Sequence, residues 1–434
     1  MKTTAFFRGV VGLSLLLNAC RAVGPDYQKP ALLPLPTEYK NQPNRQRIEH
    51  RWWEKFHDAR LTELLETARR ANFDLQEAEA HIREARALAG ESGYQNRNGK
   101  ISNSTLIAGW DLDLFGKLRR GQESAEANVQ AVEALRDALL VNISAEVATA
   151  YLELRGSQLS ISCASQAVAG AERNLEFSRK ASGLGSGTQI ESTLAEEQLA
   201  ENRAAVPLLQ QSRETALARL AVLTGRAPGT LDRDLDRPIP IPVPSDSVAA
   251  GLPTDLLRNR PDVRAAERQL ASAVADIGGE TADLYPRLSL GGTLSYSIGT
   301  PSGFLWNAGP NLSWEALNLP RVRTRIAAAQ ARADAALARY QQTVLRAAEE
   351  ATIALSAWQH QKERRDQLRY AVALSRTGSR QSQQRLQAGV LALPAVMETE
   401  RSLYRAESQL AESETATATS LVAVYKALGG GWER

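Results

Sequence analysis

The clearest pattern in the chain is an alternation of apolar and polar positions in its second half. Leu, Tyr, Ile or Gly occupies every second position over residues 288–298, with Ser, Thr or Gly between them. Residues 304–314 alternate in a similar way, and residues 299–303 supply a turn. A period of two predicts strands, so we expect a β-hairpin over residues 287–315 with one apolar face. An eleven-residue strand suits a tilted membrane crossing, although a half-buried soluble hairpin has the same period.

A weaker version of this pattern occurs in the first half. Residues 105–114 place apolar side chains, Trp110 among them, at every second position, whereas residues 91–104 contain only two large apolar residues. We therefore expect three good strands, with a shortened hairpin near residues 91–114 whose first part is poorly ordered or weakly paired, unless residues 95–105 form a short substitute. Two hairpins cannot close a barrel, and lipid does not tolerate open strand edges. Insertion into a membrane would therefore require several chains.

Long helix-forming tracts accompany these strands. No proline occurs over residues 46–206 or 321–393, and Ala, Arg, Glu, Gln and Leu dominate both stretches. Helices over residues 119–179 and 321–386 would measure roughly 90 and 100 Å at about 1.5 Å per residue. An apolar stripe follows the first tract, mainly at steps of three and four, through Val129, Val132, Leu135, Leu139, Ile143, Val147 and Leu154. Such a narrow stripe predicts packing against a partner helix.

Each tract ends at a glycine-bearing turn and leads into a further helical segment. The turns lie at residues 183–187 and at Gly389, so long helical hairpins are expected over residues 119–224 and 321–428. Residues 226–253 separate the hairpins and are rich in proline, which is typical of an extended connector.

The two halves of the chain resemble each other. Several residues of the first half have an identical or similar residue 204 positions later. The first half contains Trp110-Asp111, Glu146, Gly185, Glu196 and Gly225, and the second half contains Trp314-Glu315, Glu350, Gly389, Glu400 and Gly429 at the corresponding positions. Upstream, Asp74-Leu75 and Gly90 match Asp262-Val263 and Gly278 at an offset of 188. The difference between the offsets means that the first half lacks 16 residues between Gly90 and Trp110. We interpret residues 51–225 and 254–434 as two tandem repeats.

The amino-terminal residues are typical of an export signal. Lys2 and Arg8 precede a short apolar run that ends at Leu17-Asn18-Ala19-Cys20. This order predicts a signal peptide over residues 1–19, lipidation of Cys20 and a lipid-anchored extension over residues 20–50. No later stretch reaches the roughly 20 apolar residues of a transmembrane helix. If the protein spans a membrane, we expect strands to do so.

The composition offers little for catalysis. Removing residues 1–19 leaves 50 basic and 49 acidic residues, a net charge of +1 that indicates no nucleic-acid binding. Cys163 is the one cysteine besides Cys20, and the four histidines lack metal-ligand spacing. The glycine loop at residues 183–187 follows a helix, unlike a phosphate-binding loop. Asp111 and Asp113 fit polar groups facing a barrel lumen better than an acid–base pair. We expect no enzyme activity, metal or cofactor.

Several longer strings together resemble one known family, the lipoprotein branch of the TolC-type outer-membrane factors. This branch includes the nodulation protein NodT, OprM-like ducts, and the exit ducts of drug and metal efflux pumps. The strings span nearly the whole chain and are VGPDY at 23–27, WW at 52–53, DLDLFG at 111–116, AYLEL at 150–154, GLPTDLL at 251–257, RPD at 260–262, YP at 285–286 and YKALGGGW at 425–432.

This resemblance implies a mainly α protein with a transmembrane β-barrel portion. Three chains would form a twelve-strand barrel, with four strands from each, and a helical periplasmic tunnel. It implies an exit duct in the outer membrane, extending into the periplasm, that works with a periplasmic adaptor and an inner-membrane pump. The turns at Gly185 and Gly389 would form the tunnel tip, with Glu191 and Glu398 as gate acids. Trp110, Trp306 and Trp314 are candidates for the interfacial aromatic girdle.

Two alternatives remain open at this point. Three identical carboxylates around a pore favour cations and narrow it, but an acid in the first turn of a helix is stabilised by the helix dipole wherever it occurs. Pro394 fits a tolerated first-turn proline better than a hinge. The missing 16 residues also leave open a lipid-anchored periplasmic coiled-coil scaffold without an open pore. The exported substrate, which could be a drug, a metal ion or a nodulation signal, is not encoded in any pattern found.

Overall fold

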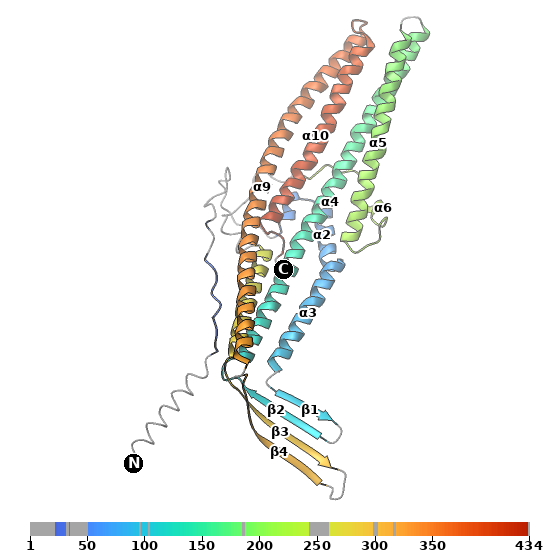
Figure 1. Cartoon of the computed structure of the whole chain (residues 1–434). Coiled ribbons are helices and arrows are strands. Elements are labelled where there is room, and N and C mark those ends of the chain that lie inside the picture. Colours follow the sequence, from blue (N-terminus) through green and yellow to red (C-terminus); the bar gives the residue numbers. More distant parts are fainter. Residues whose placement is uncertain are drawn as a thin grey trace, which may run out of the picture. The chain divides into compact units, whose positions relative to one another are not determined.

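The computed structural model describes residues 22–31, 34, 51–94, 97–102, 105–184, 187–242, 260–297, 303–315 and 318–432 (Figure 1). The predicted signal peptide, Cys20, Gly185 and part of the proline-rich connector lie outside these residues. The chain divides into two compact units. Unit 1 comprises Met1–Leu35, Glu77–Ala138 and Arg260–Arg346, and unit 2 comprises Pro36–Gln76, Leu139–Asn259 and Ala347–Arg434.

Most described residues are helical. A 3₁₀ helix, η1 (Trp52–Phe56), is followed by the helices α2 (Ala59–Ala71), α3 (Phe73–Tyr94), α4 (Lys117–Gly183), α5 (Gln189–Leu223), α6 (Asp232–Leu235), α8 (Pro261–Ala282), α9 (Leu319–Gln387) and α10 (Leu393–Ala427). The 67-residue α4 precedes the 35-residue α5, and the 69-residue α9 precedes the 35-residue α10. α4 and α9 lie where the proline-free tracts predicted long helices, and α5 and α10 follow the predicted glycine-bearing turns. Among the described helices, none combines the length and apolar character needed to cross a membrane.

The helices of unit 1 form a row that begins with α3 and ends with α9. Arg86 of α3 pairs with Glu133 of α4 at 2.6 Å, and Ser124 of α4 lies 2.9 Å from Ser272 of α8 through their hydroxyl oxygens. Ile277 of α8 then packs against Ala329 and Ala333 of α9. The same order is visible in Figure 1, where α4 separates α3 from α9.

Small residues provide much of the packing surface of α4 in unit 1. The buried apolar positions described there are Ala127, Ala131 and Ala134, whereas Leu135 is 47 % exposed. Of the predicted stripe, Val129 and Val132 are half-buried in this part of α4, and the later members Ile143, Val147 and Leu154 are buried in unit 2. Alanine allows two helices to approach closely, which a stripe counted only from large side chains does not detect.

The strands form one antiparallel sheet in the order β1 (Arg97–Ser102), β2 (Thr105–Leu112), β3 (Arg287–Ser297) and β4 (Gly303–Ser313). β3 and β4 confirm the predicted eleven-residue hairpin. The expectation of three good strands is corrected, because residues 97–102 pair with β2 along their whole length. β1 nevertheless has six residues against eleven in β3 and β4, so it is the short substitute rather than a strand of full height.

An amino-terminal strap over residues 22–31 runs along unit 1. The backbone N–H of Val23 donates to the carbonyl of Phe115 at 3.1 Å. Arg120, whose side chain is buried, donates to the Val23 carbonyl at 3.2 Å and to Asp26 at 2.5 Å. Gly24 has φ +91 and lies so close to Gly278 that a Cβ on Gly24 would overlap its backbone. Charge pairing and two glycines together fasten the strap to α4 and α8.

The main apolar core belongs to unit 2. Trp52, Trp53 and Phe56 of η1 are buried there, and the Trp52 ring stacks on Tyr425 of α10 at 5.1 Å between centroids. The buried Tyr151 of α4 donates to Asp58 at 2.7 Å, and the other carboxylate oxygen of Asp58 caps α2. The aromatic residues near the start of the chain thus pack against its last helix.

Candidate functional site

The strand register gathers the apolar positions of β2, β3 and β4 on one face of the sheet. Leu106, Leu294 and Trp306 lie opposite one another in one row, and Trp110, Leu290 and Pro310 in another. Residues paired across neighbouring strands point to the same side of a sheet. These leucines and tryptophans are exposed, and a continuous exposed apolar surface marks a site of protein or membrane contact.

The opposite face is largely polar. Asp111, Ser289 and Asn311 form one row across the three strands, and Thr293 and Asn307 are neighbours in another. Ile107 and Leu305 interrupt this polar surface. A sheet with one apolar and one mainly polar face can separate lipid from water.

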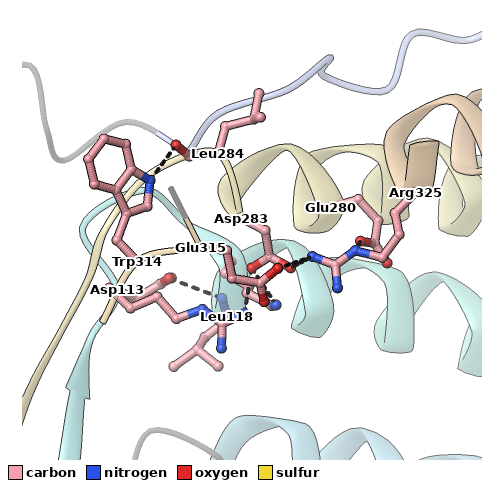
Figure 2. A network of polar contacts seen from close by, with 10 residues as sticks. Asp113, Leu118, Glu280, Asp283, Leu284, Trp314, Glu315 and Arg325 are labelled. Atoms are coloured by element: carbon pink, nitrogen blue, oxygen red, sulfur yellow. Dashed lines mark hydrogen bonds and ion pairs between the residues drawn. The ribbon is translucent and has the colours of Figure 1, made fainter. Parts of the chain in front are cut away.

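The three predicted girdle tryptophans lie toward both ends of the sheet. Trp314 follows β4 near α9, and its indole N–H donates to the carbonyl of Leu284 at 3.0 Å (Figure 2). Trp110 lies in the half of β2 near α4, whereas Trp306 is near the β3–β4 turn. All three side chains are exposed. Tryptophan rings near both ends of an apolar strand face fit the two membrane–water interfaces, where such amphipathic rings are enriched.

The sheet meets the helices at a buried acid, Asp283. It follows α8, its side chain is 5 % exposed, and it accepts from Lys117 at 2.6 Å, from Arg325 at 2.9 Å and from Arg287. Lys117 begins α4 after β2, Arg287 begins β3, and Arg325 lies in the first turns of α9 after β4. Figure 2 shows Asp283 and Arg325 in this network, with Glu280 and Glu315 also close to Arg325.

The electrostatics of this junction favour the ionised carboxylate. Burial of Asp283 acts to raise its pKa, but the hydrogen bonds and charges of Lys117 and Arg287 outweigh burial and lower the pKa below its usual value. One carboxylate therefore holds the connections from β2, β3 and β4 to their helices. Sequence reasoning missed Asp283, because no local pattern links an acid after a helix to cations as distant in the sequence as Lys117 and Arg325.

A neighbouring acid fixes the start of α4. Asp113 accepts from the backbone N–H groups of Leu118 at 3.0 Å and Arg119 at 2.9 Å, and from the Arg119 side chain at 3.2 Å. Its carboxylate thus caps the helix, which corrects the expectation that it is simply a lumen-facing group. Asp111 and Asp113 line a cavity of about 320 Å³ together with Leu112, Phe115 and Leu288.

The predicted gate residues differ in their surroundings. Glu191 lies in a capping box, where its carboxylate accepts from the Thr188 N–H at 3.0 Å and its own N–H donates to the Thr188 hydroxyl at 3.3 Å. Glu398 is 69 % exposed and lies 3.5 Å from Arg401. Gly389 adopts the left-handed conformation, φ +69, at the end of α9. The local geometry gives Glu191 a structural role and leaves Glu398 the better-exposed acid.

A buried polar cluster in unit 2 was not predicted. Glu400 of α10 accepts from Asn174 of α4 and from Gln383 of α9, each at 2.6 Å. Arg401 donates to Gln198 of α5. These bonds join the helices of both hairpins. The repeat pairs Glu400 with Glu196, which is an exposed acid 3.5 Å from Arg179, so sequence similarity alone gave no sign that only Glu400 is buried.

The other residues considered for chemistry have local partners. His81 lies 3.2 Å from Glu84, and His360 lies 3.3 Å from Glu363, one turn away on the same helix. Within the described ranges, no three His, Cys, Asp or Glu side chains are grouped as a metal site. Burial raises the pKa of the Cys163 thiol, which leaves less of the reactive thiolate at neutral pH.

Comparison with known proteins agrees with this geometry. The family model of the outer membrane efflux protein matches residues 90–226 and 252–430. Nodulation protein T of Rhizobium leguminosarum bv. trifolii is 28 % identical over 99 % of this chain and 97 % of its own. The pyoverdine export outer membrane protein OpmQ of Pseudomonas putida is 28 % identical over 97 % of this chain and 96 % of its own.

Solved structures show the same fold. The outer-membrane channel OprN aligns with a TM-score of 0.87 and 35 % identity, covering 94 % of this chain and 99 % of that chain. The open state of the Neisseria gonorrhoeae MtrE outer membrane channel aligns with a TM-score of 0.82 and 25 % identity, covering 95 % and 99 %. The family model and the fold agree over most of the chain, and the protein therefore belongs to the outer membrane efflux protein family.

Proposed function

We propose that this member of the outer membrane efflux protein family is the passive exit duct of a tripartite efflux system. The single observation that carries the proposal is the sheet, whose register gathers exposed leucines and tryptophans on one face and polar groups on the other. Open strand edges are costly in lipid. Three copies, each contributing four strands, would close a twelve-strand barrel with the apolar face toward lipid and the polar face toward the lumen.

The helices would continue the duct into the periplasm. Two tandem repeats, at residues 51–225 and 254–434, would each supply one long helical hairpin, and the lengths of α4 with α5 and of α9 with α10 support this division. The Asp283 network would join the barrel to the tunnel. Transport through such a duct needs neither a catalytic group nor a cofactor, because an inner-membrane pump supplies the driving force through a periplasmic adaptor.

The amino terminus would anchor each chain to the membrane. The strap brings Ala22 against Gly116, four residues after the end of β2. Cys20 precedes Ala22 by two residues, a span of at most about 7 Å. A lipid on Cys20 would therefore emerge beside the barrel, as expected for an outer-membrane lipoprotein.

We assign the gate more specifically to Glu398 than to Glu191. Three copies of an exposed carboxylate near the tunnel tip would attract cations and narrow the opening. Glu191 uses its carboxylate to cap α5, so replacing it changes helix stability as well as charge. Gly185 and Gly389 would form the turns at the tip.

Single-channel conductance in planar bilayers tests the duct and its gate together. Wild type is compared with Glu398→Gln, which removes the charge, and Glu398→Asp, which keeps it; Glu196→Gln is the control for an exposed acid outside the gate. We expect conducting trimers whose current or cation preference changes in Glu398→Gln and much less in Glu398→Asp. Stable trimers that never conduct would refute the duct and favour a lipid-anchored coiled-coil scaffold, because β1 is short.

A further inference from the structure

The cavity of about 320 Å³ beside Asp111 has no role in the proposed duct. It lies within unit 1, where the ends of β2 and β3 meet the start of α4 and the end of α8. Much of its wall is apolar and includes Leu112, Phe115, Leu118 and Leu288, and its charged lining consists of two acids and two cations. Mostly apolar walls with a few placed polar groups are typical of sites for small ligands.

The apolar wall continues the apolar face of the sheet. Leu112 of β2 pairs with Leu288 of β3, and Leu312 of β4 is the next member of that row. The proposed function turns this face toward lipid. Asp111 belongs to the polar row beside it, so the cavity at the strand ends borders both an apolar and a polar surface. A site of this kind suits an amphiphile.

Aromatic rings beside the cavity indicate the level of the lipid headgroups. Phe115, which lines the cavity, stacks on Tyr285 at 4.5 Å between ring centroids. The indole of Trp314 donates to the carbonyl of Leu284, the residue before Tyr285. Tyrosine and tryptophan are enriched where a membrane meets water. In the proposed duct, the cavity therefore lies at the membrane surface from which the helices enter the periplasm.

The two cations of the lining have hydrogen-bond donors to spare. Lys117 and Arg287 both bind Asp283, and their side chains are 38 and 52 % exposed. An ammonium carries three N–H donors and a guanidinium five, and each cation uses one described bond to Asp283. Asp283 supplies one negative charge to both, and Arg325 shares it. The lining therefore keeps positive charge that suits a phosphate group.

The two acids of the lining differ in what they already bind. Asp113 caps α4 and accepts from the Arg119 side chain. Asp111 is half-buried, and within the described ranges no hydrogen bond or ion pair reaches its carboxylate. Burying a charge without a partner is unfavourable. A positively charged group in the cavity would therefore stabilise Asp111.

We infer that this cavity binds the headgroup of a zwitterionic phospholipid, such as phosphatidylethanolamine, from the surrounding membrane. Lys117 and Arg287 donate to the phosphate oxygens, and the ammonium lies against Asp111. The first part of an acyl chain packs against Leu112 and Leu288. An anionic lipid satisfies the two cations but leaves the acid without a partner. The inference rests on the proposed function, because it needs the sheet to lie in a membrane.

A lipid in this cavity joins the membrane to the junction between sheet and helices. Its phosphate shares Lys117 and Arg287 with Asp283, the acid that holds β2, β3 and β4 to their helices. A ligand that binds only the folded protein stabilises it by mass action. The membrane would then favour the folded junction at the level where the barrel ends.

Native mass spectrometry of the full-length trimer in detergent tests the site, because one spectrum reports the oligomer and counts its bound lipids. Delipidated protein is titrated with phosphatidylethanolamine and, separately, with phosphatidylglycerol, whose headgroup has the phosphate but no ammonium. We expect phosphatidylethanolamine to saturate at about one molecule per chain and phosphatidylglycerol to bind more weakly. Equal affinities for the two lipids, or no saturable binding, would overturn the inference.

Two variants assign the headgroup contacts. Asp111→Asn breaks no described contact and should weaken phosphatidylethanolamine binding about tenfold while leaving phosphatidylglycerol binding unchanged. Lys117→Gln should weaken the binding of both lipids, and the same spectrum shows whether the trimer persists. The matched control Asp276→Asn changes an exposed acid on α8 and should alter neither. Wild-type affinity for phosphatidylethanolamine in Asp111→Asn would contradict the ammonium contact and sink the proposal.

A variant without the expected lipid anchor separates a membrane lipid from the chain's own acyl group. Cys20→Ser should bind phosphatidylethanolamine with wild-type affinity. Binding that appears only in Cys20→Ser would mean that the chain's own acyl group fills the cavity, against the inference. Wild-type trimers that conduct but show no lipid preference would refute this site and leave the duct standing. A monomeric wild type that does not conduct would refute the duct itself.

Discussion

Replacing Asp283 with Asn should weaken the junction between the sheet and the helices. The change removes the negative charge that Lys117, Arg287 and Arg325 share, while keeping the shape of the side chain. Asn retains one oxygen that can accept a hydrogen bond, but it also presents an N–H₂ group to three cations. The connections from β2, β3 and β4 all depend on this side chain, so the effect should reach the whole sheet.

The expected loss of stability depends on how far Asp283 is buried and how far its three cations are exposed. A hydrogen bond to a charged group contributes about 1.5–3 kcal/mol, and breaking a fully buried ion pair costs about 3–5 kcal/mol. The three cations are 38, 52 and 33 % exposed, so water partly replaces the lost carboxylate and the loss is smaller than for a fully buried group. We expect the free energy of unfolding to fall by about 2–4 kcal/mol.

The pH dependence gives the sharper test. Because the folded-state pKa of Asp283 is lowered, its stabilisation is complete above the unfolded pKa, about 4. It is lost as the pH falls through that value toward the folded pKa. The difference between wild type and Asp283→Asn should therefore stay constant between pH 8 and 5 and shrink only below about pH 4.

Guanidinium unfolding in detergent, followed by tryptophan fluorescence, measures this difference at each pH. Trp314 is a useful reporter because its indole donates to Leu284, next to Asp283. Asp276→Asn is the control, since Asp276 is an exposed acid on the same helix. A loss below about 1 kcal/mol, or a difference that already shrinks between pH 7 and 5, would show that the carboxylate does not hold the junction.

Further predictions concern the strap, the core and the cap. Gly24→Ala should loosen the strap and expose it to limited proteolysis, because Gly24 has φ +91 and no room for a Cβ against Gly278. The control Gly90→Ala should not increase cleavage, because a Cβ on Gly90 meets nothing within 4 Å. Equal cleavage of both variants would contradict the close approach of Gly24 to Gly278. Tyr151→Phe should lower the free energy of unfolding by about 1 kcal/mol, because it removes the hydrogen bond to Asp58. The same guanidinium titration measures this change. An unchanged midpoint would mean that this hydrogen bond makes no net contribution to stability. Glu191→Ala should lower the stability by about 0.3–1.5 kcal/mol, measured by thermal unfolding followed by circular dichroism, whereas Glu398→Ala should not. Equal losses would argue against the capping role.

Local sequence patterns were sufficient for most of the secondary structure and for the family. Helix-forming composition and a strand period of two depend on interactions between residues close in the chain. For this reason β3, β4 and the four long helices lie close to their predicted bounds. The short β1 was less predictable, because pairing with β2 orders a segment whose own composition is a poor strand former.

The tertiary structure decided which polar residues matter. Asp283, Arg120 and Glu400 are ordinary charged residues in the sequence, and each becomes buried among partners from segments far away in the chain. Burial and the meeting of distant charges are properties of packing, which no local period records. The sequence by itself determined the helices, the strands and the apolar face of the sheet, because these depend on neighbouring residues. Only the fold decided that Asp283 joins the sheet to the helices and that Glu400 is buried against Asn174, because those roles require residues far apart in the chain to meet in space.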